Sequence, residues 1–507
     1  RILLRLKRLA ISTSSRSQIA LVARRAAMDM ESSMSLGMTH DVETRVNTSA
    51  WTALAVFCML GPMAYGAEMM WISWSDKPST RSGMPFWSFV LLVCSYILLT
   101  PGLICTLFRY DVSALNGVME LQHGSESMIE FIKALSSTGC WYGAAVVTLY
   151  AMVIPGIKLV LLITAEVLRI RSPRSVRAAR MCILIVQMIS KWASPDMFAY
   201  VLLMYLVRGL DHPPTLKGVG QLDLGFTSFA LFCIFSTVAS LGIQAPELPT
   251  SETAQAVTSE PTPLRRKLRS VAPFVATFLF VAFAASLAIG AYMPCMALRL
   301  DLDMLYEPSG PVPLSFKPFV EALDLAELVH AEVSLWECLG TLAKWGASGN
   351  ANFFIAFVLF AVFAIGFTIL DMLVLTVAAW QLRPSRRQCS DIETAGHSTD
   401  ESQGPRRLLS VARVLKKLSM LDVAIVGIVV VTLCGYVYRK SGVIVSMRWG
   451  LSVLFVAELC HYAAYHLVTG LAPSAPPQPA ACNEKANDAG VYVEDELSSE
   501  SAGSTNA

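Results

Sequence analysis

Residues 140–167 read CWYGAAVVTLYAMVIPGIKLVLLITAEV, an apolar run whose charged side chains are Lys158 and Glu166. Such a run is long enough to cross a bilayer as a helix, which takes about 20 apolar residues. A second run occupies residues 352–381, where the charged side chain is Asp371. The chain has 507 residues, 54% hydrophobic and 15% charged, whereas soluble domains carry about 25% charged residues. These features predict an all-α, polytopic transmembrane helical protein.

Short matches recur in the same order in the two halves of the chain, roughly two hundred residues apart, which indicates an internal duplication. We therefore expect two tandem four-helix repeats in parallel orientation, plus one extra N-terminal apolar segment at residues 51–72. The matching residues are Pro101, Arg109, Ser127, Glu130, Lys191 and Asp196 in the first copy, and Pro294, Arg299, Ser334, Glu337, Lys417 and Asp422 in the second.

The apolar runs divide the chain into domains. A basic and polar segment, 1–48, is expected to be disordered, as is the acidic tail 471–507. Between them lie a first membrane repeat with the extra helix (49–243), a flexible linker (244–270) and a second membrane repeat (271–470). The predicted spans are 51–72, 86–107, 140–167, 195–209, 224–243, 272–296, 352–381, 421–438 and 449–470.

Arginine and lysine cluster in the connections 168–191, 244–270 and 382–419, while the connections 109–138 and 297–349 are acidic. The positive-inside rule places the basic connections and the C-terminal tail in the cytosol. The acidic connections then lie outside, each with a short amphipathic helix. If 51–72 crosses the membrane, the basic N-terminus is outside, against the rule; a re-entrant or interfacial helix would remove this conflict.

Polar residues beside or within the spans are the candidate transport or lipid-contact residues. Lys191 with Asp196, and Lys417 with Asp422, precede spans; the two acids suit helix starts, or else the cytosolic edge of a pathway between the repeats. Pro101 and Pro294 either open a helix to a cavity or kink it near the interface. Arg109 and Arg299 form local ion pairs, or guide an anionic lipid.

Charged residues within spans indicate function by default. Lys158, just after Pro155, needs a partner or a wet cavity, and Glu166 and Asp371 lie late in equivalent spans. Glu458 and His461 predict an interhelical hydrogen bond rather than a metal site, because a second Glu-x-x-His pair is absent from the sequence. Cys140 and Cys338 allow a disulfide as an alternative to free thiols.

Motifs of other functional classes are missing from the sequence. It has no Walker-type loop, dinucleotide fingerprint or zinc-protease helix. We therefore expect no enzyme activity and no cofactor. The basic clusters lie beside spans, so they indicate topology and contact with anionic lipids and not a nucleic-acid surface.

Several of these motifs together resemble the paraquat-inducible protein A family. The first copy has Ser127, Leu135, Gly139-Cys-Trp141, Ile154-Pro155-Gly-Ile-Lys158 and Lys191-Trp-Ala-Ser-Pro-Asp196. The family typically has a proline–x–x–lysine in one span and a Met-Leu/Val-Asp-Val sequence opening the next. The second copy has Met420-Leu-Asp422-Val423 but Phe367-Thr-Ile-Leu-Asp371 in place of the proline–lysine pair.

The resemblance implies a membrane subunit for lipid handling or intermembrane lipid transport, with a mammalian-cell-entry-domain partner acting in trans. Bacterial members commonly carry Cys-x-x-Cys zinc ribbons; this chain has none, so we expect no metal. The alternatives are a proton- or ion-coupled small-solute transporter using Glu166, Asp371 and Glu458, and a non-transporting membrane scaffold.

Overall fold

The computed structural model describes residues 44–70, 84–114, 119–171, 173–210, 216–246, 263–301, 330–382, 403–435 and 443–471. The predicted disordered segments therefore lie almost entirely outside the described residues, and so does most of the predicted linker. Residues 263–270 of that linker, however, begin a long helix, and residues 403–418 of the predicted loop 382–419 form another.

Eight helices are long and apolar enough to cross a membrane, which makes the chain a polytopic helical membrane protein. They are Thr44–Met70, Phe86–Ile104, Trp141–Arg169, Leu224–Gly242, Leu268–Tyr292, Ala351–Gln381, Arg407–Cys434 and Trp449–Leu471. The predicted span 195–209 is α7 (Pro195–Gly209), which has 15 residues. It is too short to cross a bilayer alone, since about 20 residues are needed.

The first half of the molecule, α2 to α8, contains helices and three strands. Its elements are α2 (Phe86–Ile104), β1 (Thr106–Ala114), β2 (Met119–Ser127), α3 (Met128–Ser137), α4 (Trp141–Thr148), the π-helical turn η1 (Leu149–Val153), α5 (Ile154–Arg171), α6 (Pro173–Ile189), the short helix η2 (Ser190–Ala193), α7, β3 (Leu216–Leu222) and α8 (Leu224–Gly242).

The second half, α9 to α18, follows the same order among its described elements, except that it has no counterpart of η2 between α16 and α17. These are α9 (Pro263–Tyr292), β4 (Pro294–Leu300), β5 (Ala331–Ser334), α13 (Leu335–Ala347), α14 (Ala351–Val358), the π-helical segment η4 (Leu359–Gly366), α15 (Phe367–Gln381), α16 (Gln403–Leu418), α17 (Leu421–Cys434), β6 (Val443–Met447) and α18 (Trp449–Leu471).

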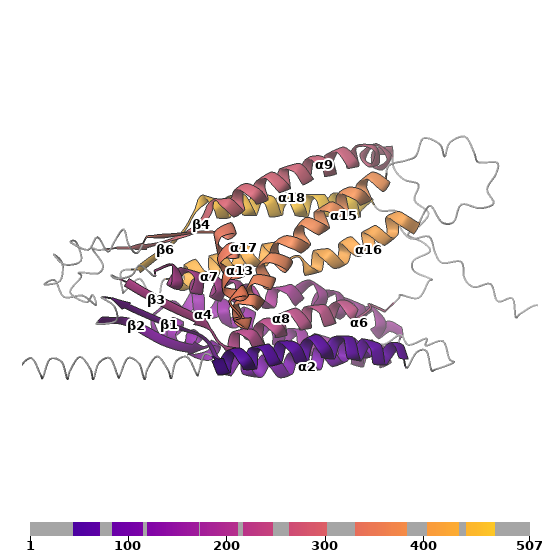
Figure 1. Cartoon of the computed structure of the whole chain (residues 1–507). Helices are drawn as coiled ribbons and strands as arrows, with labels where there is room; N and C mark the ends of the chain where they lie inside the picture. The colour runs from indigo at the N-terminus through magenta and orange to yellow at the C-terminus, as the bar shows by residue number, and fades with distance from the viewer. Residues whose placement is uncertain are drawn as a thin grey trace, which may run out of the picture.

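Each half carries a three-stranded antiparallel sheet, which the all-α expectation omitted. The strand orders are β2-β1-β3 and β5-β4-β6. Both sheets lie at one end of the helices (Figure 1). The predicted spans 86–107 and 272–296 run into β1 and β4, because their apolar character continues past the end of the helix. Strand pairing there satisfies the backbone hydrogen bonds that the helix no longer provides.

The sheet registers correct the pairing of residues between the halves. Thr106 opposes Ser127, and Pro294 opposes Ser334, so Thr106 and Pro294 hold equivalent places. Arg109 and Arg299 are then two positions out of step. Pro101 lies inside α2, as expected. Pro294, by contrast, is the first residue of the strand β4, so it does not break or kink a helix. The two prolines, like the two arginines, match between the halves in the sequence because they are of the same type. The hydrogen-bonded register of the strands shows that they do not occupy the same positions.

The halves meet where α7 packs against α17, and we call this contact the seam. Gly427 of α17 lies so close to α7 that a Cβ there would be 2.7 Å from both the Phe198 Cβ and the Pro195 carbonyl oxygen. Phe198 and Phe360 of the second half also stack edge to face across the seam, with centroids 4.7 Å apart. The core is therefore continuous between the halves.

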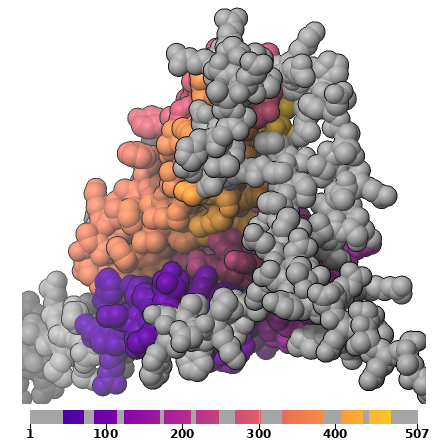
Figure 2. Space-filling view, turned by 90° about the vertical axis from the view of Figure 1, so that its right-hand side faces the viewer, coloured from indigo at the N-terminus to yellow at the C-terminus, as the bar shows by residue number. Residues whose placement is uncertain are grey.

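The extra N-terminal helix, Thr44–Met70, contacts both halves. Near its start, Asn47 Nδ2 and Trp51 Nε1 donate to the Gly349 carbonyl oxygen at 2.8 and 2.9 Å. Near its end, Glu68 accepts from the Trp87 backbone N–H at 3.0 Å. Figure 2, viewed from the helix ends opposite the sheets, shows this N-terminal region (indigo) against the second half (orange).

Candidate functional site

A buried ion pair crosses the seam. Lys191 of η2 lies 2.5 Å from Asp422 of α17, and their side chains are 10% and 9% exposed. The Tyr462 hydroxyl of α18 donates to the same Asp422 oxygen at 2.9 Å. Charges removed from water require partners of this kind, because an isolated buried charge is costly.

The pair continues into a larger cluster in the second half. Lys416 Nζ lies 3.1 Å from Glu458 Oε1 and 3.5 Å from the centroid of the Tyr462 ring. His461 Nδ1 lies 3.2 Å from Glu458 and from Lys416, and its Nε2 lies 2.8 Å from Asp371 Oδ2. We call these residues the charge network: Lys191, Asp371, Lys416, Asp422, Glu458, His461 and Tyr462.

The charge network has a net charge of −1 when its carboxylates are ionised, its lysines are protonated and His461 is neutral. Its three carboxylates face two lysines. Neutrality then requires a proton on His461 or on a carboxylate, and a buried cluster favours neutrality because desolvation penalises net charge. The second oxygen of Asp371, Oδ1, is buried without a hydrogen-bond partner in the described part of the chain. The network therefore suits the uptake and release of a proton.

A smaller polar cluster surrounds Lys158 in the first half. Its Nζ is fully buried and donates to Ser190 Oγ at 2.5 Å and to the Ser236 carbonyl oxygen at 2.6 Å. Ser190 in turn donates to Ser240 Oγ at 3.1 Å. No carboxylate lies within ion-pair distance of Lys158 among the described residues. The partner that Lys158 was expected to need is therefore a set of hydroxyl and carbonyl oxygens.

The two clusters occupy corresponding positions. Lys158 is the fifth residue of α5, and Asp371 is the fifth residue of α15. Counted along α8 and α18, Ser236 and His461 are both the thirteenth residue. Ser190 stands six residues before Asp196, just as Lys416 stands six residues before Asp422. One location thus holds a lysine among serines in the first half and an acid–histidine–lysine group in the second.

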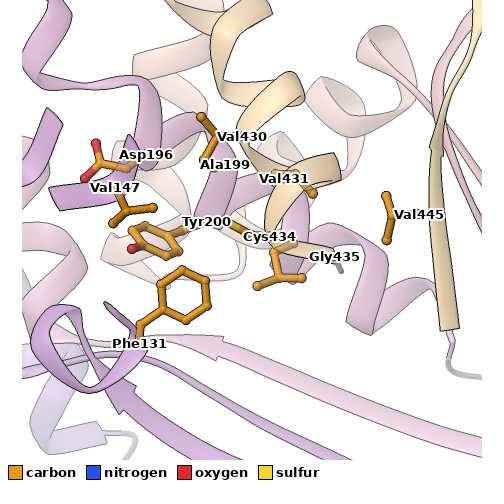
Figure 3. A pocket seen from close by; sticks show the side chains of 11 residues that line it. Phe131, Val147, Asp196, Ala199, Tyr200, Val430, Val431, Cys434, Gly435 and Val445 are labelled. Carbon is orange, nitrogen blue, oxygen red and sulfur yellow. The ribbon is translucent and has the colours of Figure 1, made fainter. Parts of the chain in front are cut away.

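Asp196 lies beside the seam but outside the network. Its Oδ1 accepts from the Met197 N–H at 3.1 Å, while Oδ2 has no hydrogen-bond partner within the described ranges. It borders a cavity of about 20 Å³, otherwise lined by apolar or aromatic side chains of α3, α4, α7, α17 and β6 (Figure 3). That volume holds about one water molecule.

The repeated lysine–acid pairs do not form symmetric bridges. Lys191 reaches Asp422, whereas Lys417 donates to Gln187 Oε1 at 2.6 Å and leaves Asp196 unbridged. Both acids do bind the N–H of the residue that follows, in the first turn of a helix. Ser419 does not cap α17, because Met420 is the N-cap and Ser419 Oγ bonds Thr368 Oγ1 instead.

The remaining predicted residues lie apart from the network. Arg109 pairs with Asp223, the residue before α8, at 2.5 Å and not with its neighbour in sequence. Arg299 is exposed on β4. The carbonyl oxygen of Pro155 accepts from the Tyr96 hydroxyl at 2.9 Å. Glu166 forms a partly exposed pair with Arg169 at 3.3 Å.

Other predictions concern Cys140, Cys338 and the Glu458–His461 pair. Both cysteines are buried free thiols, so the alternative of a disulfide is wrong. The interhelical hydrogen bond is confirmed, with Asp371 as the partner of His461. Lys416 and Tyr462 were not among the predicted residues, although Lys416 is adjacent to the predicted Lys417. Within the described ranges, no three His, Cys, Asp or Glu side chains are placed to hold a metal ion.

Comparison of the chain with family models, curated proteins and solved structures found no match.

Proposed function

We propose that the protein is a lipid-handling membrane protein, built from two tandem repeats in parallel orientation. In this proposal the halves move against each other at the seam, and the charge network binds or releases a proton as they do. Lipids are handled along the outer, membrane-facing surface of the helices. The resemblance to paraquat-inducible protein A agrees with this function and suggests a mammalian-cell-entry-domain partner in trans.

The arrangement of elements supports the duplication. Each half has a three-stranded sheet of the same strand order and a span interrupted by a π-helical segment. Gly225 and Gly450, each the second residue of the last helix of its half, both approach backbone carbonyl oxygens that follow the first helix. Such close backbone contacts restrict the position to glycine, so their recurrence favours common origin over chance.

Charge supports a cytosolic location for the ends of the helices opposite the sheets. The basic segments of α6 and α16 lie at those ends (Figure 1), with Arg177 and Arg180 on one and Arg407 and Arg413 on the other. The positive-inside rule then places both sheets outside the cytosol. Both repeats follow the rule in the same orientation.

The observation that carries the proposal is the buried charge network at the seam. Charged groups within a membrane protein are costly and are characteristic of pathways, proton relays and switches. Because Lys191 and Asp422 belong to different halves, any change in their pairing changes how the halves fit together. A rigid scaffold would gain more from well-packed apolar residues at the same positions.

The space at the seam favours a lipid over a soluble solute. The cavity beside Asp196 has about 20 Å³ and is walled by apolar side chains. A water-soluble substrate would need a larger polar cavity, lined by groups that replace its hydration. A lipid needs only a path along the outside of the bundle, because its tails are already in the membrane.

One alternative has a specific observation in its favour. The line of contacts from Asp371 through His461 to Glu458 has the form of a proton relay. A proton-coupled small-solute transporter would use such a relay while the halves open a path that is closed in this structure. This alternative predicts uptake of a soluble substrate driven by a pH gradient.

Reconstitution separates the two functions. Purified protein in phospholipid vesicles is given a fluorescent phospholipid and an imposed pH gradient, and redistribution of the label is measured. We expect the labelled lipid to redistribute only when the protein is present. The rate of redistribution should fall at least tenfold in Asp371→Asn and stay unchanged in the matched control Glu166→Gln. No lipid movement, together with pH-driven solute uptake, would support the alternative instead. Crosslinking in native membranes tests the proposed partner.

A further inference from the structure

An apolar groove runs along the membrane-facing side of the second half. It lies between α9 on one side and η4 with α15 on the other, and has a volume of about 350 Å³. Phe283, Leu287 and Ala291 are its buried lining residues, and Ala284 and Ala288 border it from the same helix. These positions recur every three or four residues, so they follow one face of α9.

Small side chains give the groove its depth. Ala284 and Ala288 project only a methyl group each, whereas Ile365 and Ile369 form the opposite wall. Almost all of the surface that lines the groove is apolar. A polar ligand would lose its hydrogen bonds to water here without replacement. The ligand must therefore be apolar over the whole length of the groove.

The length of the groove matches one leaflet of a bilayer. Its lining on α9 extends from Phe280 to Tyr292, which is roughly 18 Å at a helical rise of 1.5 Å per residue. Half of the hydrocarbon core is about 15 Å thick. Tyr292 and Trp336 border the groove and are 78% and 66% exposed, at the sheet end of α9. Such aromatic residues favour the membrane–water interface.

We propose that this groove binds one acyl chain of a phospholipid, taken from the leaflet at the sheet end. The inference rests on the proposed lipid-handling function and identifies where the tail lies. The headgroup then remains at the interface beside Trp336. On the inner side, the ring of Phe283 lies 6.1 Å from the His461 ring, centroid to centroid. The bound tail is thus one side chain away from the charge network.

Photolabelling tests the site directly. Purified protein is placed in phosphatidylcholine vesicles that contain a trace of the same lipid with a diazirine on its acyl chain. After illumination, the labelled peptides are identified by mass spectrometry. We expect label to concentrate on α9 around Ala284 and on α15 around Ile369. Ala288→Trp and Ala284→Trp fill the groove and are expected to reduce this label about fivefold.

A neighbouring alanine supplies the control. Ala285 is exposed on α9 but does not line the groove, so Ala285→Trp makes the same chemical change outside it. Label retained in Ala285→Trp and lost in either groove variant supports the site, even if the vesicles show no lipid movement. Label spread evenly along the exposed faces of α9 and α18, unchanged by both groove variants, overturns it, even if the protein moves lipids.

Discussion

Lys158 and Asp371 are each the fifth residue of a helix, α5 and α15, yet one side chain is basic, the other is acidic, and they do not contact each other. Each follows a π-helical segment, and each is bound within its own half, Lys158 by Ser190 and Asp371 by His461. The lysine faces fixed hydroxyl and carbonyl oxygens. The aspartate faces His461, which in turn contacts Glu458. The two halves therefore share a framework and differ in their chemistry.

Replacing Lys158 separates the contribution of its charge from that of its volume. In Lys158→Met the stem stays and the buried charge is lost, so we expect less than about 1.5 kcal/mol loss of stability. In Lys158→Ala a cavity remains, which typically costs about 2–5 kcal/mol. Reversible unfolding in detergent measures both. Equal losses would show that the ammonium group itself stabilises the fold.

The pair across the seam is suited to a double-mutant cycle. Lys191→Met or Asp422→Asn alone leaves its partner buried without its counter-charge, which costs about 3–5 kcal/mol. We expect the double variant to lose less than the sum, because it leaves no unpaired charge. Lys417→Met, which removes a bond to Gln187 at a half-buried position, is the milder control. Strict additivity would argue against direct pairing.

The close approach at the seam predicts sensitivity to a single methyl group. Gly427→Ala would place a Cβ 2.7 Å from the Pro195 carbonyl oxygen, so α7 and α17 must move apart. Overpacking of this kind costs about 1–3 kcal/mol. Gly156→Ala is the matched control, since a Cβ there meets nothing within 4 Å. Thermal stability in detergent should fall for the first variant alone.

The cap of α3 predicts a local pH dependence. Hydrogen bonds from the Ser127 backbone N–H and hydroxyl hold the pKa of Glu130 below its ordinary value of 4.5. A lowered pKa means that the contribution to stability is complete above pH 4.5 and is lost as the pH falls through the lower value. We expect the amides of α3 to be less protected from hydrogen exchange in Glu130→Gln than in the wild type at pH 7. Near pH 3 this difference in protection between the two proteins should become smaller. A constant difference would contradict this.

The helices were predictable from the sequence because their apolar runs are long and their polar interruptions few. The strands were not, because in residues 86–107 the chain passes from helix to strand without a change in hydropathy. Amphipathic helices were expected at residues 125–138 and 320–345, and the structure has α3 at Met128–Ser137 and α13 at Leu335–Ala347. Residues 331–334 of the second range form β5 instead. In α3 and α13 the helical spacing of apolar residues and the serine–glutamate cap give a local signal.

Part of the charge network was also visible in the sequence. Lys191 and Asp422 were candidates because a lysine followed by an acid recurs before a span in both halves, and Asp371 was a candidate because charges within spans are rare. Glu458 with His461 were recognised as a hydrogen-bonding pair. The choice of partners was not predictable, because Lys191 and Asp422 are 231 residues apart and meet only when the halves pack. Spacing also could not show that Lys416, rather than Lys417, faces the interior.

The N-terminal helix has a mechanical consequence. Asn47 and Trp51 fasten its beginning to Gly349 in the second half, and Glu68 fastens its end to Trp87 in the first. A helix stretches little along its axis, so it links these two points of the two halves at a fixed distance. Asn47 Oδ1 also accepts from the Ala351 N–H at 2.8 Å, so the beginning of the helix is held by three hydrogen bonds to the second half. If the halves separate as proposed, these bonds must break, and they therefore set a cost on the movement that does not depend on the charge network.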